Sequence, residues 1–79
     1  IRCYYANPYT IGSIWKCDGL KQNVQYVMDV YDLQGRVRLN VPIPEDGTFR
    51  IMGRLDEGMH LMTIRGGLDI HTEKVLIAH

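Results

Sequence analysis

Two cysteines and three histidines carry the most reactive side chains of this 79-residue chain: Cys3, Cys17, His60, His71 and His79. A cysteine and a histidine together can supply a thiol nucleophile and its base, but any small domain with both residue types permits such a pair. The five residues also lack the close paired spacing of structural zinc sites. We therefore expect no metal site, and we interpret both cysteines as structural residues.

The other candidates for catalysis lack the sequence contexts that such chemistry needs. Ser13 is the only serine, and no nucleophile-elbow motif surrounds it. Gly66-Gly67 lies in an expected hairpin and opens no helix, so it forms no phosphate-binding loop. Expected turns hold most of the carboxylates considered, and in turns Asp caps its own backbone and Glu is solvated. The carboxylates considered are Asp29, Asp32, Glu45, Asp46, Asp56 and Glu57. The residues therefore give no support to a catalytic site, although an acid/base pair of carboxylates stays open, and we expect no cofactor.

The two cysteines leave two interpretations open. In an extracellular domain, a bond between Cys3 and Cys17 would close a loop that stabilises the fold by about 3 kcal/mol on the chain-entropy model. In a reducing cytosol the same residues would be two small apolar side chains. The residues themselves do not decide between these states.

Charge and hydropathy exclude several classes of partner. Nine basic residues balance nine acidic ones, and they are scattered singly, so we expect no nucleic-acid binding. No apolar run approaches the roughly 20 residues that a membrane-spanning helix needs. The start of the chain, Ile1 to Tyr5, lacks the form of a signal peptide. The first residue is Ile rather than Met, which suggests a fragment of a longer chain or a processed product, and we favour a fragment.

The elements that must position these side chains are β-strands. Apolar residues recur at every second position, and turn-forming residues interrupt the pattern at short intervals. We predict one domain over residues 1–79, an all-β, immunoglobulin-like antiparallel β-sandwich of about seven short strands with no helix. The expected strands cover residues 2–5, 14–17, 24–31, 37–41, 48–51, 59–65 and 70–77.

Several positions within this pattern carry specific expectations. Pro42 lacks a backbone donor, so the segment after residue 41 must be a connection or a protected edge. Leu55 should be tucked inward from its loop, and His60, which alternates with Met62 and Ile64, should be partly buried with one backbone hydrogen bond. The aromatic residues either fill the core or furnish a carbohydrate-stacking surface, and we favour the core.

Four segments together resemble the type A C-terminal sorting domains of proteins exported by the type IX (Por) secretion system of Bacteroidetes. Asn7-Pro8 resembles the Pro-Asn-Pro element near the family's start, although Ala6 replaces the first proline. Residues 30–36 resemble its hydrophobic-Tyr-Asp-Leu-x-Gly-Arg turn, and residues 55–64 its Leu-x-x-Gly-x-Tyr strand, with His60 in place of tyrosine. Residues 73–77 resemble its basic-hydrophobic ending. The likeness spans nearly the whole chain.

This resemblance implies a non-catalytic domain at the end of a longer exported protein. Its partners would be the outer-membrane translocon, a shuttle protein and a surface sortase, and it would occur in the periplasm in transit and then at the cell surface. Such a destination favours the disulfide between Cys3 and Cys17. The matching residues that serve fold or recognition are Asn7, Pro8, Asp32, Gly35, Arg36, Leu55, Gly58, Lys74, Val75, Leu76 and Ile77.

Within that set, we expect different roles for the turns and for the terminal strand. Asp32, Gly35, Arg36, Leu55 and Gly58 make turns or plug the core, so fold maintenance explains them. The run from Lys74 to Ile77 is the better candidate for direct recognition, because a partner pairs with a terminal strand at low cost.

Two other functions remain open from the residues alone. One is an immunoglobulin-like adhesion or accessory module that binds carbohydrate or protein through aromatic side chains, and the other is a small domain attached to an enzyme. Position in the full gene distinguishes them, because a sorting domain must lie at the extreme C-terminus. Any weak homodimer should form through an unpaired strand edge or an aromatic patch rather than through charge.

Overall fold

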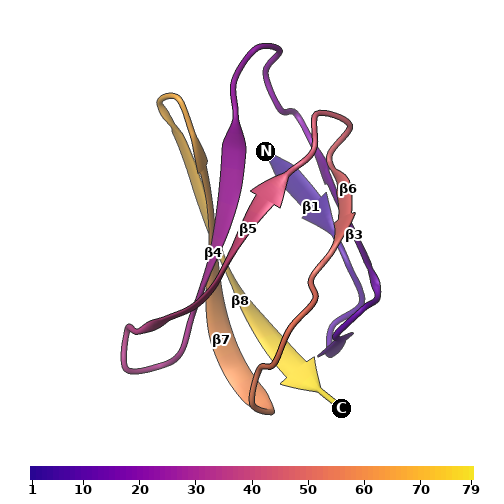
Figure 1. Cartoon of the computed structure of the whole chain (residues 1–79), viewed down its shortest axis with the longest axis vertical. Coiled ribbons are helices and arrows are strands. Elements are labelled where there is room, and N and C mark those ends of the chain that lie inside the picture. Colours follow the sequence, from indigo (N-terminus) through magenta and orange to yellow (C-terminus); the bar gives the residue numbers. More distant parts are fainter.

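Two β-sheets pack face to face in the computed structural model, which describes residues 1–79 (Figure 1). The expected all-β sandwich is confirmed, with eight strands and no helix. The strands are β1 (Arg2–Tyr4), β2 (Tyr9–Thr10), β3 (Ile14–Asp18), β4 (Tyr26–Tyr31), β5 (Val37–Ile43), β6 (Thr48–Arg50), β7 (Gly58–Gly66) and β8 (Asp69–Ala78).

The smaller sheet has the order β1-β3-β6, and the larger has the order β2-β8-β7-β4-β5. All neighbours are antiparallel except β2, which runs parallel to the end of β8 over two residue pairs. The eighth strand, absent from the prediction, is this two-residue β2. So short a strand contains no repeat of alternating residues by which a sequence pattern could identify it.

Strand β4 lies inside the larger sheet, between β5 and β7. Tyr26, Met28 and Val30 are buried on its inner face. The strand begins at Tyr26 rather than Val24, so the predicted start was two residues early. The reason is local: Asn23 has φ 61°, a left-handed conformation that belongs to a turn and keeps the chain out of the sheet there.

Strand β5 shows how the fold accommodates Pro42. This residue lies within β5, opposite Val27 of β4, and β5 forms the outer edge of its sheet. A missing N–H costs no ladder hydrogen bond when it points away from the neighbouring strand. Both predicted roles are observed: Pro42 and Ile43 lie in this edge strand, and residues 44–47 form the connection to β6.

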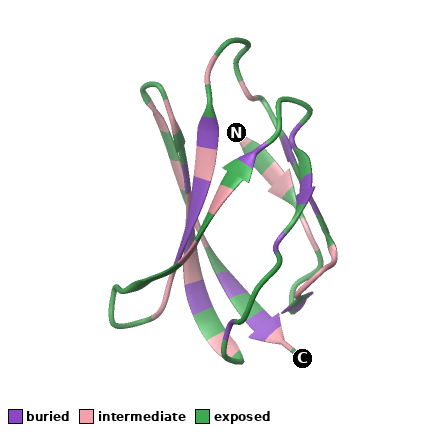
Figure 2. Cartoon of the chain, viewed as in Figure 1, coloured by how far each residue is buried: buried purple, intermediate pink, exposed green.

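Buried positions occur on strands of both sheets (Figure 2). The core between the sheets centres on Trp15, which is completely buried. Tyr5 stacks on it with ring centroids 3.8 Å apart, and Tyr9 meets it edge-on at 5.4 Å. Trp15, Tyr9 and Tyr26 are thus core residues, as favoured from the sequence. Leu55 is also buried, as expected.

His60 has the environment predicted for it. Its side chain is buried on the inner face of β7, and Nδ1 lies 3.1 Å from the carbonyl oxygen of Gly58. A single backbone hydrogen bond satisfies this ring nitrogen, so the residue has a structural explanation.

We expect Gly47→Ala to destabilise the domain by more than about 1 kcal/mol. Gly47 has φ 75°, and an added Cβ would overlap the carbonyl oxygen of Cys17, whose N–H donates to the Gly47 carbonyl. Gly12→Ala is the matched control, because Gly12 also has a positive φ but would bring its Cβ near no other atom. Equal losses of melting temperature in the two variants would show that the overlap is unimportant.

Candidate functional site

The four segments that resemble sorting-domain motifs lie at one end of the sandwich. Across the larger sheet, Tyr31 pairs with Leu61 and Leu61 pairs with Lys74, while Gly58 pairs with Ile77. The β4–β5 turn, the start of β7 and the end of β8 therefore share the end of the sheet at which the chain terminates (Figure 1). We call this the C-terminal end of the sandwich.

The β4–β5 turn is organised by one carboxylate. Asp32 Oδ1 accepts hydrogen bonds from the backbone N–H groups of Gln34 and Arg36, at 2.9 and 3.0 Å, and Oδ2 accepts one from Arg36 Nε at 2.8 Å. Gly35 occupies the position that needs a positive φ, at 84°. The backbone hydrogen bonds from Arg36 hold the pKa of Asp32 below its usual value. These three motif residues therefore make a closed, rigid turn.

Leu55 and Gly58 connect the smaller sheet to β7. Leu55 is 4% exposed and plugs the core from the loop, whereas Gly58 begins β7 with φ 120°. That conformation is rarely accessible to a residue with a side chain, although an added Cβ would meet no other atom. Both residues thus serve the path of the chain.

Asn7 and Pro8 lead into β2 through a cis peptide bond and reach the last strand directly. The side-chain oxygen Oδ1 of Asn7 accepts a hydrogen bond from the backbone N–H of Leu76 at 3.2 Å. Strand β2 then pairs with Ile77 and Ala78. Two motif segments that are separated by 69 residues in the sequence are therefore in contact.

The terminal run divides into two faces. Val75 and Ile77 are buried in the core, at 0% and 1% exposure, whereas Lys74 and Leu76 point outward. The sequence had grouped these four residues as one candidate for recognition. Only Lys74 and Leu76 offer side chains that a partner can reach in the folded domain.

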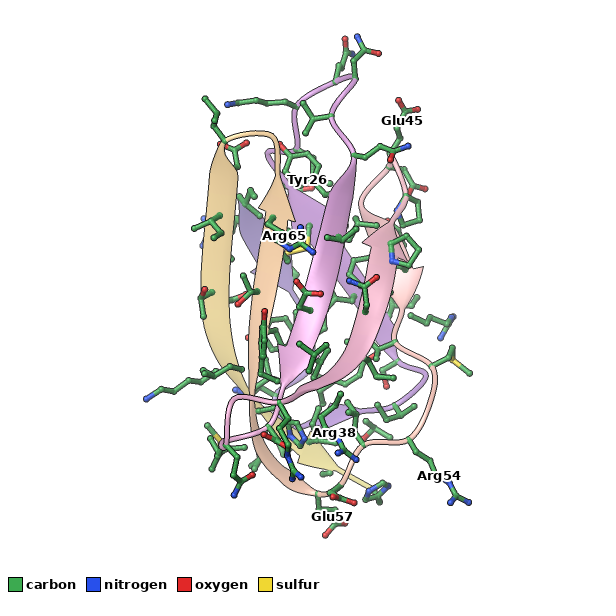
Figure 3. All side chains as sticks on the ribbon, turned by 60° about the vertical axis from the view of Figure 1, so that its left-hand side comes forward. Tyr26, Arg38, Glu45, Arg54, Glu57 and Arg65 are labelled. Carbon is green, nitrogen blue, oxygen red and sulfur yellow. A yellow bond between two sulfur atoms is a disulfide. The ribbon has the colours of Figure 1, made fainter.

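An open strand edge adjoins these residues. Leu76 directs its N–H away from β7, toward Asn7, and backbone groups in an antiparallel strand alternate between its two sides. Ile70, Thr72 and Lys74 therefore direct their N–H and C=O groups to the same side as Leu76. Strand β2 pairs only with Ile77 and Ala78, so the edge from Ile70 to Lys74 is unpaired (Figure 3). We call it the β8 edge.

The outer face of the larger sheet holds a polar network that the sequence did not reveal. Asp29 Oδ2 accepts a hydrogen bond from Arg65 Nε at 2.8 Å, and Oδ1 accepts one from Asn40 Nδ2 at 2.6 Å. Asp29 is buried although the alternation of β4 places it on the outer face of the sheet, where Arg65 also lies (Figure 3). The hydrogen bond from Arg65 lowers the pKa of Asp29, and the bond from Asn40 adds to this effect.

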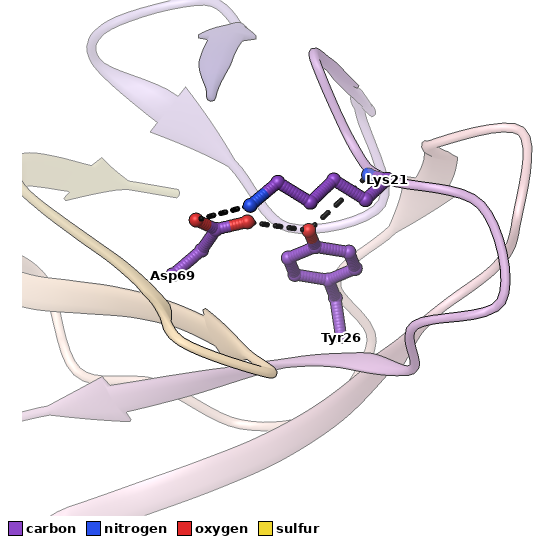
Figure 4. A network of polar contacts seen from close by, with 3 residues as sticks. All are labelled: Lys21, Tyr26 and Asp69. Atoms are coloured by element: carbon purple, nitrogen blue, oxygen red, sulfur yellow. Dashed lines mark hydrogen bonds and ion pairs between the residues drawn. The ribbon is translucent and has the colours of Figure 1, made fainter.

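A second network ties loops together at the opposite end of the sandwich (Figure 4). The Tyr26 hydroxyl donates to Asp69 Oδ2 at 2.8 Å and accepts from the backbone N–H of Lys21 at 3.2 Å. Lys21 Nζ lies 3.3 Å from Asp69 Oδ1. The hydrogen bond from Tyr26 lowers the pKa of Asp69. This network joins the β3–β4 loop to the β7–β8 hairpin.

A hollow of about 630 Å³ opens at the same end, between the β3–β4 loop and the end of β5. Its wall includes Lys21, Glu45 and Asp46, three residues on turns that are exposed to solvent. No hydrogen bond joins Lys21 to Glu45 or Asp46 across the hollow.

Cys3 and Cys17 lie opposite each other on β1 and β3 and form a disulfide. Their Cα atoms are 4.1 Å apart, well within the approximate 7 Å limit for such a bond. Strand β1 has three residues and one neighbouring strand, so this covalent link is a major part of what holds it.

Comparisons with known proteins matched no family model, no curated protein and no solved structure. The chain contains no helix that could span a membrane. The geometry of the C-terminal end and the β8 edge is therefore the basis for a functional assignment.

We expect Asp29→Asn to destabilise the domain at neutral pH by about 1 to 3 kcal/mol, with the lower end favoured because Arg65 is mostly exposed. The wild-type contribution is present above the unfolded-state pKa, near 3.8, and is lost as the pH falls through the lowered folded pKa. Thermal melts at decreasing pH should therefore show a shallower loss of stability for the variant. Asp56→Asn removes the same charge from an exposed loop and should leave the acid dependence unchanged.

Proposed function

We propose that this domain is a non-catalytic sorting signal that directs an attached protein through a type IX secretion system. The observation that carries the proposal is the meeting of all four motif segments at the C-terminal end, beside the β8 edge. Their contact through Asn7 and Leu76 gives a single folded surface to residues that are scattered in the sequence. A surface of this kind is what a protein machine can read without any reactive group.

The β8 edge supplies a mode of recognition. Unpaired N–H and C=O groups at Ile70, Thr72 and Lys74 match the hydrogen-bonding pattern of an added strand. The outward side chains of Lys74 and Leu76 then supply specificity at the C-terminal end of that edge. A second copy of the domain could pair there in the same way, which would produce weak homodimers.

The remaining motif residues serve this surface indirectly. Asp32, Gly35 and Arg36 close the β4–β5 turn, and Leu55 fixes the loop before β7. Strand β4 pairs with β7, and β7 pairs with β8. The turns at the ends of β4 and β7 therefore keep the end of β8 in position. We infer that their role in export is to maintain the fold.

The partners in this proposal are the outer-membrane translocon, a shuttle protein and the surface sortase that removes the domain. The protein would pass through the periplasm to the cell surface, as the end of a longer exported chain. The disulfide between Cys3 and Cys17 is in keeping with such oxidising surroundings. An adhesion module that binds sugars by aromatic stacking has less support, because Trp15, Tyr9 and Tyr26 are buried.

The direct test is to fuse residues 1–79 to the C-terminus of a passenger with an inner-membrane export signal, in a bacterium with working type IX machinery. We expect the passenger to reach the surface. The double variant Lys74→Ala, Leu76→Ser should leave it in the periplasm, because it alters outward side chains and spares the buried Val75 and Ile77. Thermal melting of the isolated variant must show that it remains folded.

Ile70→Ser is the matched control, since it changes an exposed apolar residue on the same face of β8 at the far end of the strand. This variant should still be exported. Retention of the intact fusion in the periplasm, with the domain folded, would refute the sorting function and favour an adhesion module.

Thr72→Pro tests the β8 edge itself. The substitution removes an N–H that points away from β7, so the ladder hydrogen bonds between β7 and β8 are retained. If an added strand pairs here, export should fall severalfold while the fold survives. Normal export of a folded Thr72→Pro domain would show that recognition uses side chains and not this edge.

A further inference from the structure

Three residues that the sequence pattern did not link lie close together between the two sheets. Cys3 of β1 faces His71 and Glu73 of β8, and their ligand atoms all lie within 4.8 Å of one another. The alternation of β8 places His71 and Glu73 on its inner face, in line with the buried Val75. Strand β1, which carries Cys3, belongs to the smaller sheet, and this sheet faces β8. We call these three residues the Cys3 cluster.

Two polar atoms of this cluster lack hydrogen-bond partners. His71 Nε2 and Glu73 Oε2 are both shielded from solvent and make no hydrogen bond, and burial and the nearby Glu73 carboxylate raise the pKa of Tyr5 beside them. They lie 3.4 Å apart and form an ion pair when His71 is protonated. With a neutral imidazole neither atom has a partner, and a metal ion that both contact would satisfy them.

The separation of these atoms fits a zinc ion. Two ligand atoms that each lie about 2.0 to 2.2 Å from a tetrahedral zinc are separated by roughly 3.4 Å. The observed distance between His71 Nε2 and Glu73 Oε2 is 3.4 Å. A cysteine thiolate, an imidazole nitrogen and a carboxylate oxygen are all ordinary zinc ligands, and three protein ligands leave one position for water.

The disulfide determines whether the third ligand is present. While Cys3 is bonded to Cys17, its sulfur is not a thiolate and cannot complete the set. We propose that reduction of this disulfide creates a zinc site from Cys3 Sγ, His71 Nε2 and Glu73 Oε2. The domain would then exchange a covalent link between β1 and β3 for a metal link between β1 and β8. This inference does not depend on the proposed role in secretion.

The chemistry of the exchange is balanced by a dithiol reductant. The dithiol transfers two electrons and two protons to the Cys3–Cys17 bond, which yields two thiols, and the reductant becomes a cyclic disulfide. Zinc then displaces the proton of the Cys3 thiol, which is released to solvent. A disulfide oxidant that accepts two electrons and two protons would re-form the Cys3–Cys17 bond and become a dithiol, and loss of the Cys3 thiolate would release the ion.

A pair of serine variants isolates the metal ligand from the disulfide. Cys17→Ser and Cys3→Ser both abolish the bond, but only Cys17→Ser retains the Cys3 thiol. We expect Cys17→Ser to bind zinc at least about 10- to 100-fold more tightly than Cys3→Ser, measured anaerobically by competition with a chromogenic chelator. With cobalt as the probe, only Cys17→Ser should show a thiolate-to-metal charge-transfer band and tetrahedral visible bands.

Further variants test the β8 ligands in the Cys17→Ser background. His71→Ala and Glu73→Gln should each weaken zinc binding by at least about tenfold, whereas His79→Ala, a histidine outside the cluster, should leave it unchanged. Equal zinc affinities of Cys17→Ser and Cys3→Ser would overturn the assignment. Retention of full affinity in both β8 variants would overturn it as well.

Measurements on the wild-type domain test the zinc site independently, even if reduction of the disulfide unfolds the chain. Zinc should raise the melting temperature of the reduced protein and leave that of the oxidised protein unchanged. If the reduced chain or Cys17→Ser is unfolded without metal, zinc should restore the near-ultraviolet circular dichroism of the buried Trp15. A reduced chain that does not respond to zinc, whether folded or unfolded, would refute the site.

Discussion

The burial of Trp15 between the two sheets is the interaction on which the rest of the structure depends. Its ring is stacked by Tyr5 and met edge-on by Tyr9, so two segments that precede β3 are held against it. Tyr9 also donates its hydroxyl proton to the Ser13 carbonyl and accepts from the N–H of Ile51. A domain of this size buries only somewhat more than about 60% of its unfolded surface, so one large aromatic centre is a substantial part of its core.

The smaller sheet needs this centre because its strands are short. Strands β1 and β6 have three residues each and pair only with β3. The disulfide adds a covalent constraint to β1 through Cys3, whose sulfur also approaches His71 and Glu73. The approach of β1 to β8 also shields His71 Nε2 and Glu73 Oε2 from solvent, and neither atom makes a hydrogen bond. These atoms and Cys3 together form the candidate metal site.

The two ends of the sandwich are held by different means. At one end Asp69 binds Tyr26 and Lys21, so a charged network fixes the loops. At the other, the Asp32 turn, the Leu55 plug and the Asn7 contact surround the end of β8. That second end combines rigid turns with an incompletely paired strand, a combination suited to recognition by another protein.

The sequence by itself determined the all-β class, the inward faces of β4 and β7, the buried Leu55 and the single hydrogen bond of His60, because alternation and turn residues are local properties. It could not reveal β2, the outward yet buried Asp29, or the division of residues 74–77 between core and surface. Those features depend on which strands are neighbours and which edges are covered. Only the tertiary structure brought Asn7 to Leu76 and Cys3 to His71 and Glu73, since the contacts join opposite ends of the chain across two sheets.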